Sequence, residues 1–320
     1  MISTGKKNNL LITGIILGIV YGMATRFIFG KEANIASLTY LFLFPAILGI
    51  IPLIFTDEEK LRSYKNIIFI PWLTMSSFFL TLLLSGVEDV LCLMVLCLPF
   101  FLLATIGSLL YKLIRISRRR KKGKTLVLVL LPFLFIHAEQ YFKRPVEKFR
   151  IESKIDIYAP TEHIWNNIVE VKEITSEEYK SGFFNHAGIP RPISATVTRR
   201  GKGGHRTGTF QGGLTFIETI TEYKENRRIS FFIEVDTATV RQKVFDQHIL
   251  KGNYFSFVDA TYEITVGEKG KCQLTLSSVY QLNSTINFYG QFWGDIIISD
   301  FQERLLKVLK KRCEVTQKRI

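Results

Sequence analysis

A glycine-rich stretch, RRGKGGHRTGTFQGG at residues 199–213, would do chemistry if its backbone cradled a phosphate. A P-loop requires the spacing G-x-x-x-x-G-K-[ST], which is absent, and a dinucleotide fingerprint begun at Gly201 would need glycine where Arg206 stands. Both motifs also require a helix after the loop, whereas the following TFQGGLTFIETITEY has a strand pattern. We therefore expect Gly201, Gly203 and Gly204 to turn one hairpin, and Gly212–Gly213 another.

His248, in FDQHILKGNYF, has the neighbours best suited to acid–base chemistry. Asp246 and Tyr254 would orient its imidazole, which titrates near neutral pH. The alternative is a histidine that hydrogen-bonds the backbone of its loop. The sequence contains no G-x-S-x-G nucleophile elbow and no H-E-x-x-H zinc pair, and its four cysteines show no disulfide or metal spacing. No metal and no cofactor is implied.

Glu218 and Arg191 are the other charged candidates. Glu218 alternates with Phe216 and Ile220, so one strand register turns it toward an apolar face. A carboxylate there would bind the polar group of a ligand or act as a base with a raised pKa. In the opposite register Glu218 is merely paired. Arg191 stands between two prolines and would guard a cavity mouth or pair with an acid.

The chain consists of two parts of different hydropathy, with a boundary near residue 142, and the candidate residues named above all lie in the second part. The chain has 320 residues, 47% of them apolar, which is room for two domains. Residues 1–142 contain long uncharged runs, whereas charged residues recur every few positions in 143–320. We expect about five transmembrane helices, at Asn8–Thr25, Ala33–Thr56, Asn66–Val87, Val90–Tyr111 and Thr125–Phe142. The fifth is short and contains a proline; we expect it to span, the alternative being a helix along the interface.

Basic residues are divided unevenly among the loops between these runs. The N-terminus, residues 57–65 and Lys112–Lys124 carry 13 of them, and the intervening loops carry two. Because cytoplasmic loops retain Lys and Arg, we expect a cytoplasmic N-terminus in an inner or plasma membrane and an outward-facing C-terminal domain. The run RRRKK lies between two spans, which favours lipid headgroups over nucleic acid as its partner. The runs contain no interior Asp, Glu or Lys, which argues against a transporter.

In residues 143–320 apolar and polar residues alternate with period two, which is typical of the strands of an antiparallel sheet with one buried face. Apolar sets recur at 149–157, 229–235, 258–266 and 272–282. A helix is expected after Pro160, burying Ile164, Trp165 and Ile168. A long final helix, from about Tyr289 to Cys313, carries an apolar stripe that would cover the sheet: Trp293, Ile297, Phe301, Leu305 and Leu309.

The order of these features resembles the SRPBCC superfamily, the START-like and polyketide cyclase/dehydrase-like helix-grip proteins. The matching stretches are IDIYAPTEHIWNNI, GHRTGTFQGGLTFIETITEYKENRRISF and FDQHILKGNYFSFVDATYEI with the final helix, about residues 147–316. The resemblance implies an α+β fold in which a curled antiparallel sheet wraps the long helix around an apolar cavity. It does not cover the membrane half. The superfamily includes lipid carriers, cyclases and hormone receptors, so the fold does not fix an activity.

We therefore expect an all-α transmembrane bundle at 1–142 and a helix-grip domain at 143–320. The main hypothesis is a membrane-anchored module that binds a hydrophobic or amphipathic small molecule, lipid-like or polyketide-like. The candidate ligand-binding residues are Phe216, Ile220, Phe231, Tyr262, Tyr280, Trp293, Ile297, Phe301 and Arg191. The alternatives are a cyclase/dehydratase-type enzyme that uses His248 and Glu218, and a non-catalytic membrane protein whose bundle recruits protein partners.

Overall fold

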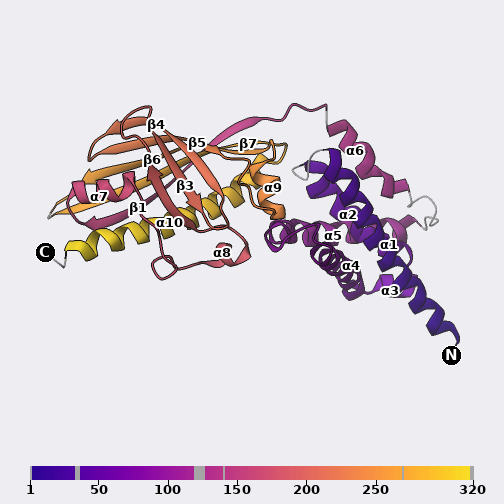
Figure 1. Cartoon of the computed structure of the whole chain (residues 1–320). Helices are drawn as coiled ribbons and strands as arrows, with labels where there is room; N and C mark the ends of the chain where they lie inside the picture. The colour runs from indigo at the N-terminus through magenta and orange to yellow at the C-terminus, as the bar shows by residue number, and fades with distance from the viewer. Residues whose placement is uncertain (1, 33–36, 119–126, 140, 269, 318–320) are drawn as a thin grey trace. The chain divides into compact units, whose positions relative to one another are not determined.

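The computed structural model describes residues 2–32, 37–118, 127–139, 141–268 and 270–317 (Figure 1). The chain divides into two compact units. The first, which we call the membrane unit, comprises Met1–Arg144 with Ser284–Ile286. The second, which we call the sheet unit, comprises Pro145–Asn283 with Asn287–Ile320. Each unit is described by itself.

The described residues of the membrane unit form helices and short connections. The helices are α1 (Ile2–Glu32), a π-helical turn η1 (Thr39–Leu43) followed directly by α2 (Phe44–Ile54), α3 (Glu58–Arg62), α4 (Tyr64–Leu84), α5 (Val90–Arg118) and α6 (Leu131–Glu139). Three helical segments are long and apolar enough to cross a membrane, namely Asn9–Ile28, Tyr64–Leu84 and Val90–Arg115.

The other two expected spans correspond to shorter apolar helices, Thr39–Ile54 and Val127–Glu139. Each is shorter than the ~20 residues of a straight helical crossing. Of the basic stretch Lys112–Lys124 and the start of the fifth expected span, residues 119–126 lie outside the described residues.

Small residues bring α2 and α5 close together. A Cβ on Gly49 would lie 2.6 Å from the carbonyl oxygen of Ala104, and one on Gly107 would collide with the carbonyl of Ala46. On each helix the two small residues are three positions apart, so they share one face. Close backbone approach at small residues is how helices pack when no hydrophobic effect drives them together in lipid.

One antiparallel sheet of seven strands forms the centre of the sheet unit. The strands are β1 (Val146–Tyr158), β2 (Pro192–Val197), β3 (His205–Phe210), β4 (Thr215–Lys224), β5 (Arg228–Val235), β6 (Phe255–Val266) and β7 (Lys271–Asn283). Their spatial order is β1-β7-β6-β5-β4-β3-β2 (Figure 1). The start of β1 pairs with the end of β7, Val146 opposite Asn283.

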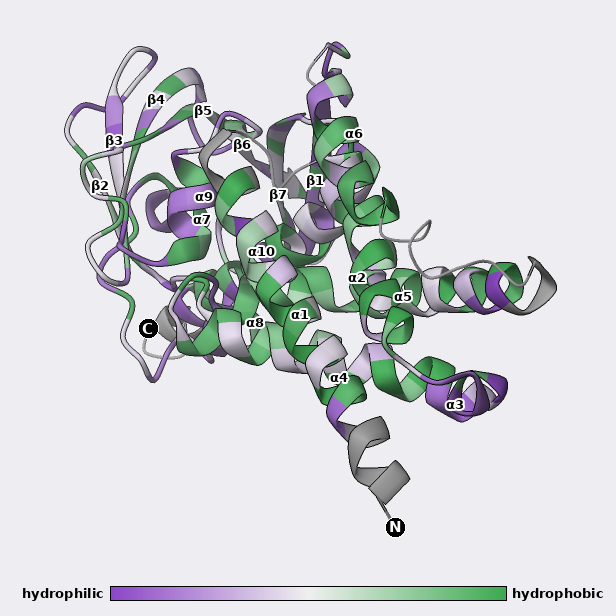
Figure 2. Cartoon of the chain, turned by 90° about the vertical axis from the view of Figure 1, so that its right-hand side faces the viewer, coloured by the Kyte–Doolittle hydropathy of each residue, from purple (hydrophilic) through white to green (hydrophobic). Residues whose placement is uncertain are grey.

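The alternation predicted from the sequence gives the sheet one buried face, which we call the inner face. Ile229, Phe231 and Ile233 of β5 are buried there. The prediction for 258–266 is wrong at both ends. A bulge between Phe257 and Asp259 shifts the register so that Phe257 packs against the core, and Val266 at the end of the strand is 69% exposed. In Figure 2 hydrophobic residues dominate α1 and α2, whereas hydrophobic and hydrophilic residues are mixed along the strands.

The glycines of residues 199–213 form the two predicted turns. Gly201 and Gly203 adopt positive φ between β2 and β3, and Gly212 and Gly213 do so between β3 and β4. Residues with a Cβ rarely adopt this conformation, which explains the composition of the stretch. A phosphate-cradling loop followed by a helix is therefore not what this stretch forms.

Four helices complete the sheet unit: α7 (Thr161–Val169), α8 (Phe183–Ala187), α9 (Val244–Leu250) and α10 (Asn287–Gln317). α7 buries Ile164, Trp165 and Ile168, as predicted. α9 was not predicted. α10 lies against β1 and β7, where Ser153 donates a hydrogen bond to Gln302 Oε1 and Gln302 Nε2 donates to Ser278, both at 2.9 Å. A curled antiparallel sheet with a long C-terminal helix is the α+β helix-grip fold, which confirms the predicted fold class.

Candidate functional site

The C-terminal half of α10 is packed tightly against the sheet unit. Leu305, Leu309 and Cys313 are buried. They belong to one hydrophobic core with residues of α7 and of the inner face, including Trp165 and Leu274. The chain's own side chains fill this end of the unit.

The N-terminal half of α10 is packed less completely. Phe301 and, one and two turns before it, Ile297 and Trp293 are only half-buried, and so are Phe210 of β3 and Phe257 of β6. The indole N–H of Trp293 is buried without a hydrogen-bond partner in the described part of the chain. Phe210, Phe257 and Phe301 pack against the edge of the hydrophobic core, so the chain covers the apolar side chains at this end of the sheet unit only in part.

The aromatic rings at this end form a continuous series. Ring centroids are 6.0 Å apart for Phe301 and Phe210, 4.7 Å for Phe210 and Phe216, and 5.3 Å for Phe216 and Phe257. Such spacings are those of favourable aromatic contacts. The series therefore links α10 to β3, β4 and β6 with an apolar, shape-defined surface.

A buried ion pair lies on the inner face of β3 and β4. The strand register sets Arg206 opposite Glu218, and Arg206 Nε donates to Glu218 Oε2. Arg206 is 4% exposed and Glu218 is 7% exposed. Arg206 Nη1 also donates to the carbonyl of Ile168 at 2.6 Å, and its guanidinium lies 3.8 Å from the ring centre of Phe231. These partners compensate the burial of the two charges.

Glu218 keeps one oxygen for a further partner. Its Oε1 receives no hydrogen bond from the described residues, since the Arg206 contact is to Oε2. The neighbouring inner position on β3 is Gly208, where a Cβ would lie 3.1 Å from Oε1. Burial raises the pKa of Tyr262, near Arg206, to about 12, so its hydroxyl is neutral at physiological pH. This group offers hydrogen-bonding atoms to the polar end of an otherwise apolar molecule.

Tyr280 is held by α10. Its hydroxyl donates to Asp295 Oδ1 at 2.6 Å and to the carbonyl of Gln291 at 3.3 Å. Burial, with the nearby Asp295 carboxylate as a smaller cause, raises the pKa of Tyr280. Its hydroxyl is therefore engaged in fixing the N-terminal half of α10 to β7.

The predicted ligand-binding residues fall into two groups. Those on the sheet are buried in the hydrophobic cores: Phe216, Ile220, Phe231, Tyr262 and Tyr280. Those on α10 and before β2 are half-buried: Trp293, Ile297, Phe301 and Arg191. Arg191 Nη1 donates to the carbonyl of Ile174 at 3.4 Å. Glu218 both faces the core with Phe216 and Ile220 and is paired, which the sequence presented as alternatives.

Asp246, predicted to orient His248, forms an ion pair with Arg241. Arg241 Nε donates to Asp246 Oδ2 at 2.5 Å, and Arg241 Nη2 donates to Oδ1 at 3.0 Å and to the carbonyl of Gly188 at 2.8 Å. This pair ties α9 to the end of α8. His248 lies on α9 in the sheet unit.

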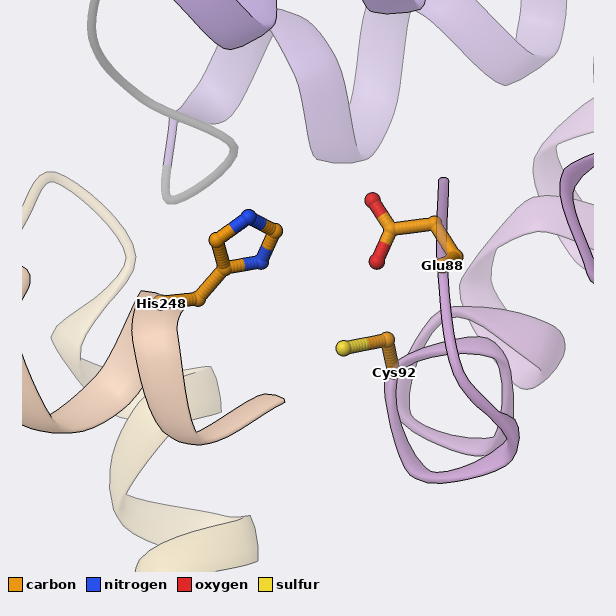
Figure 3. A group of neighbouring side chains, drawn as sticks. All are labelled: Glu88, Cys92 and His248. Carbon is orange, nitrogen blue, oxygen red and sulfur yellow. The ribbon is translucent and has the colours of Figure 1, made fainter. Parts of the chain in front are cut away.

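The membrane unit also contains a buried ion pair. Arg26 Nε donates to Glu88 Oε1 at 2.6 Å, and both side chains are buried. Glu88 precedes α5 and Cys92 lies in its first turn; Figure 3 draws their side chains, together with His248 of the sheet unit. Because the charges of Glu88 and Arg26 are opposite, the pair is buried near the C-terminal end of α1 without a net charge.

Arg206, Gln302 and Arg241 are the polar residues that sequence reasoning missed. Arg206 alternates with Gly208 and Phe210, so period-two alternation would have placed it on the inner face. Gln302 follows Phe301 on α10 and carried no signal, because one polar residue beside an apolar stripe is common. The partner of Arg241 depends on α9, which was not predicted.

Comparisons with known proteins find similarity at the level of structure. No family model and no curated protein matches the chain. An uncharacterized protein from Bacillus thuringiensis is 14% identical with a TM-score of 0.33, covering 51% of this chain and 97% of its own. A Thermus thermophilus protein is 17% identical (TM-score 0.33, 52% and 97% covered), and truncated norcoclaurine synthase from Thalictrum flavum is 10% identical (TM-score 0.32, 53% and 96% covered).

Similarities this low carry no argument about activity. The class of this protein is defined by its own elements: a helix-grip sheet unit joined to a helical unit with three helices long and apolar enough to cross a membrane.

Proposed function

We propose that the sheet unit binds a hydrophobic or amphipathic small molecule between the inner face of the sheet and the N-terminal half of α10. The observation that carries the proposal is the change of packing along α10. Leu305 and Leu309 are buried, whereas Trp293, Ile297 and Phe301 are half-buried. The half-buried apolar side chains of α10, together with the half-buried Phe210 and Phe257 of the sheet, provide an apolar surface that a small molecule could cover.

The polar end of the ligand would meet Glu218. Oε1 of this carboxylate would accept a hydrogen bond from a hydroxyl, amide or amine, while Oε2 accepts the hydrogen bond from Arg206. A mostly apolar surface with a few placed polar groups is the composition of small-molecule sites. The ligand class is therefore lipid-like or polyketide-like, with one polar group that donates a hydrogen bond.

We propose further that the membrane unit anchors this module through five crossings, with the N-terminus in the cytoplasm and the sheet unit outside. The course of the last apolar helix supports the fifth crossing. Leu128 and Phe55, which follows the end of α2, pack against the same hydrophobic cluster, whereas Glu139 accepts hydrogen bonds from the N–H groups of Leu38 and Thr39 at the start of η1. The segment 128–139 thus runs antiparallel to η1 and α2 along their length.

Native mass spectrometry of the full chain in detergent tests ligand binding. We expect a bound mass on the wild-type chain. Ala260→Phe adds a ring to the inner face of β6 and should remove that mass; Glu263→Phe adds the same ring to the exposed face of the same strand and should not. No bound mass on the wild-type chain, together with no binding of an added fluorescent fatty acid, would overturn the proposal.

A further inference from the structure

A second apolar stripe lies on the surface of α10 beside the residues of the candidate site. Phe288, Phe292 and Ile296 are 59%, 52% and 39% exposed, and their spacing of four residues places them in one row along the helix. Exposed apolar side chains that gather on one surface often mark a site of contact with a membrane or a protein. The row borders the candidate site, because the rings of Phe292 and Trp293 are in contact, with centroids 5.5 Å apart.

The segment that carries this stripe is almost uncharged. Residues 287–299 contain one acidic residue, Asp295, and no basic residue; the Asp295 carboxylate accepts a hydrogen bond from the Tyr280 hydroxyl of β7. The following turns are different, because Asp300, Glu303, Arg304 and Lys307 are charged. Only the first three turns of α10 are therefore suited to an apolar medium.

The start of α10 is tethered close to the last apolar helix. Asn287 Nδ2 donates a hydrogen bond to the carbonyl of Pro145, the residue directly before β1. Residues 140–145 connect the end of α6 to the start of β1, and six extended residues reach at most about 20 Å. A bilayer that holds α6 is therefore within reach of the first turns of α10.

The residues between α6 and the middle of β1 have the composition of a membrane interface. Tyr141 and Phe142 are exposed aromatic residues, and Lys143 and Lys148 are exposed cations. Aromatic rings partition to the headgroup level, and cations attract anionic lipid headgroups. The charges of Lys143, at the end of the membrane unit, and Lys148, at the start of the sheet unit, thus complement an anionic lipid surface.

We propose that Phe288, Phe292 and Ile296 dock the N-terminal half of α10 into the boundary between headgroups and acyl chains of the bilayer that holds the chain's own spans. The stripe would be an amphipathic interfacial contact, and the candidate site lies beside it on the same helix. This inference does not depend on ligand binding, since it concerns only the outer side of α10. It would place the loosely packed end of the sheet unit at the lipid surface.

Tryptophan quenching by brominated lipids tests the docking in the full chain. In a background of Trp72→Phe and Trp293→Phe, which leaves the buried Trp165, Phe292→Trp adds one reporter to the stripe. Phe232→Trp is the matched control, because Phe232 is an exposed phenylalanine on β5. Both chains are placed in nanodiscs of phosphatidylcholine and phosphatidylglycerol, with and without bromine on the acyl chains.

We expect the added emission of Phe292→Trp to fall by about half in brominated lipid, because an interfacial helix buries its apolar face roughly 5–10 Å into this boundary. The emission of Phe232→Trp should not change. Equal emission of Phe292→Trp in both lipids overturns the proposal. A blue-shifted emission that brominated lipid does not quench would show that a protein surface covers the stripe, and this result also overturns it.

Discussion

Replacing one partner of the ion pair between Arg206 and Glu218 should destabilise the sheet unit strongly. Arg206→Met removes the guanidinium and keeps a side chain of comparable length. It leaves the Glu218 carboxylate buried without its cation, and it leaves the carbonyl of Ile168 without its donor. Breaking a buried ion pair in this way costs about 3–5 kcal/mol, a large part of a typical stability of about 5–15 kcal/mol.

The double variant Arg206→Met/Glu218→Leu should recover much of this loss. It leaves no buried charge, so the remaining cost is chiefly the unpaired carbonyl of Ile168, about 1–3 kcal/mol. The loss for the double variant should therefore fall short of the sum of the two single losses by at least about 2 kcal/mol. This coupling separates an effect of pairing from a general loss of packing.

Urea unfolding of the full chain in detergent measures these energies. Trp165 is buried on α7 beside Tyr223, with ring centroids 5.2 Å apart, so its emission reports the sheet unit in a background of Trp72→Phe and Trp293→Phe. Arg228→Met is the control, because Arg228 is a partly exposed arginine whose partner Glu222 is also partly exposed. It should cost about 0–1 kcal/mol.

The reasoning fails if Arg206→Met costs no more than Arg228→Met. It also fails if the double variant loses as much as the sum of the single variants, because the two side chains would then act independently.

Three further outcomes are expected. Hydrogen bonds from Arg312, with the Arg312 charge and the Thr175 N–H as smaller causes, lower the pKa of Glu178 to about 2 from its ordinary 4.5. The stability that Glu178 adds is thus present above pH 4.5 and lost as the pH falls toward 2. Glu178→Gln should therefore lower the free energy of unfolding by about 1 kcal/mol at pH 7, after allowance for screening, and by almost nothing near pH 2. Urea titrations at a series of pH values measure this difference. Gly107→Val should lower the thermal midpoint of the detergent-solubilised chain by placing side-chain atoms against the carbonyl of Ala46, whereas Leu110→Val, at an exposed position, should not. Lys251→Cys, in a chain whose four native cysteines are replaced by alanine, should react with a membrane-impermeant maleimide in intact cells; labelling only after lysis would mean that the fifth segment does not cross.

Several features of this protein follow from its sequence alone because they depend on local periodicity. Alternation of apolar residues in 149–157 and 229–235 predicted which side of β1 and β5 is buried, since side chains on a strand point alternately to the two faces. Glycines at 201, 203, 212 and 213 predicted the two turns, since each needs positive φ. The four-residue spacing of Leu305 and Leu309 predicted the buried stripe of α10.

The pairing of Arg206 with Glu218 was decided by the tertiary structure. The residues are twelve positions apart, and only the register of β3 against β4 sets them opposite each other. Likewise, the side chain of Gln302 forms hydrogen bonds with Ser153 and Ser278 only because α10 lies across β1 and β7. Hydrogen bonds between distant residues leave no periodic signal in the chain, so sequence reasoning listed Glu218 without its partner.

The looser packing at the start of α10 was also beyond the sequence. Trp293 and Leu309 both belong to the apolar row predicted for this helix, and their hydropathy does not distinguish the half-buried residue from the buried one. The difference arises because α7 and the neighbouring inner-face residues fill the space beside Leu309, whereas Trp293 lies beyond them. The hydropathy of a side chain shows that its burial is favourable, but the arrangement of the surrounding helices and strands decides whether other residues of the chain bury it.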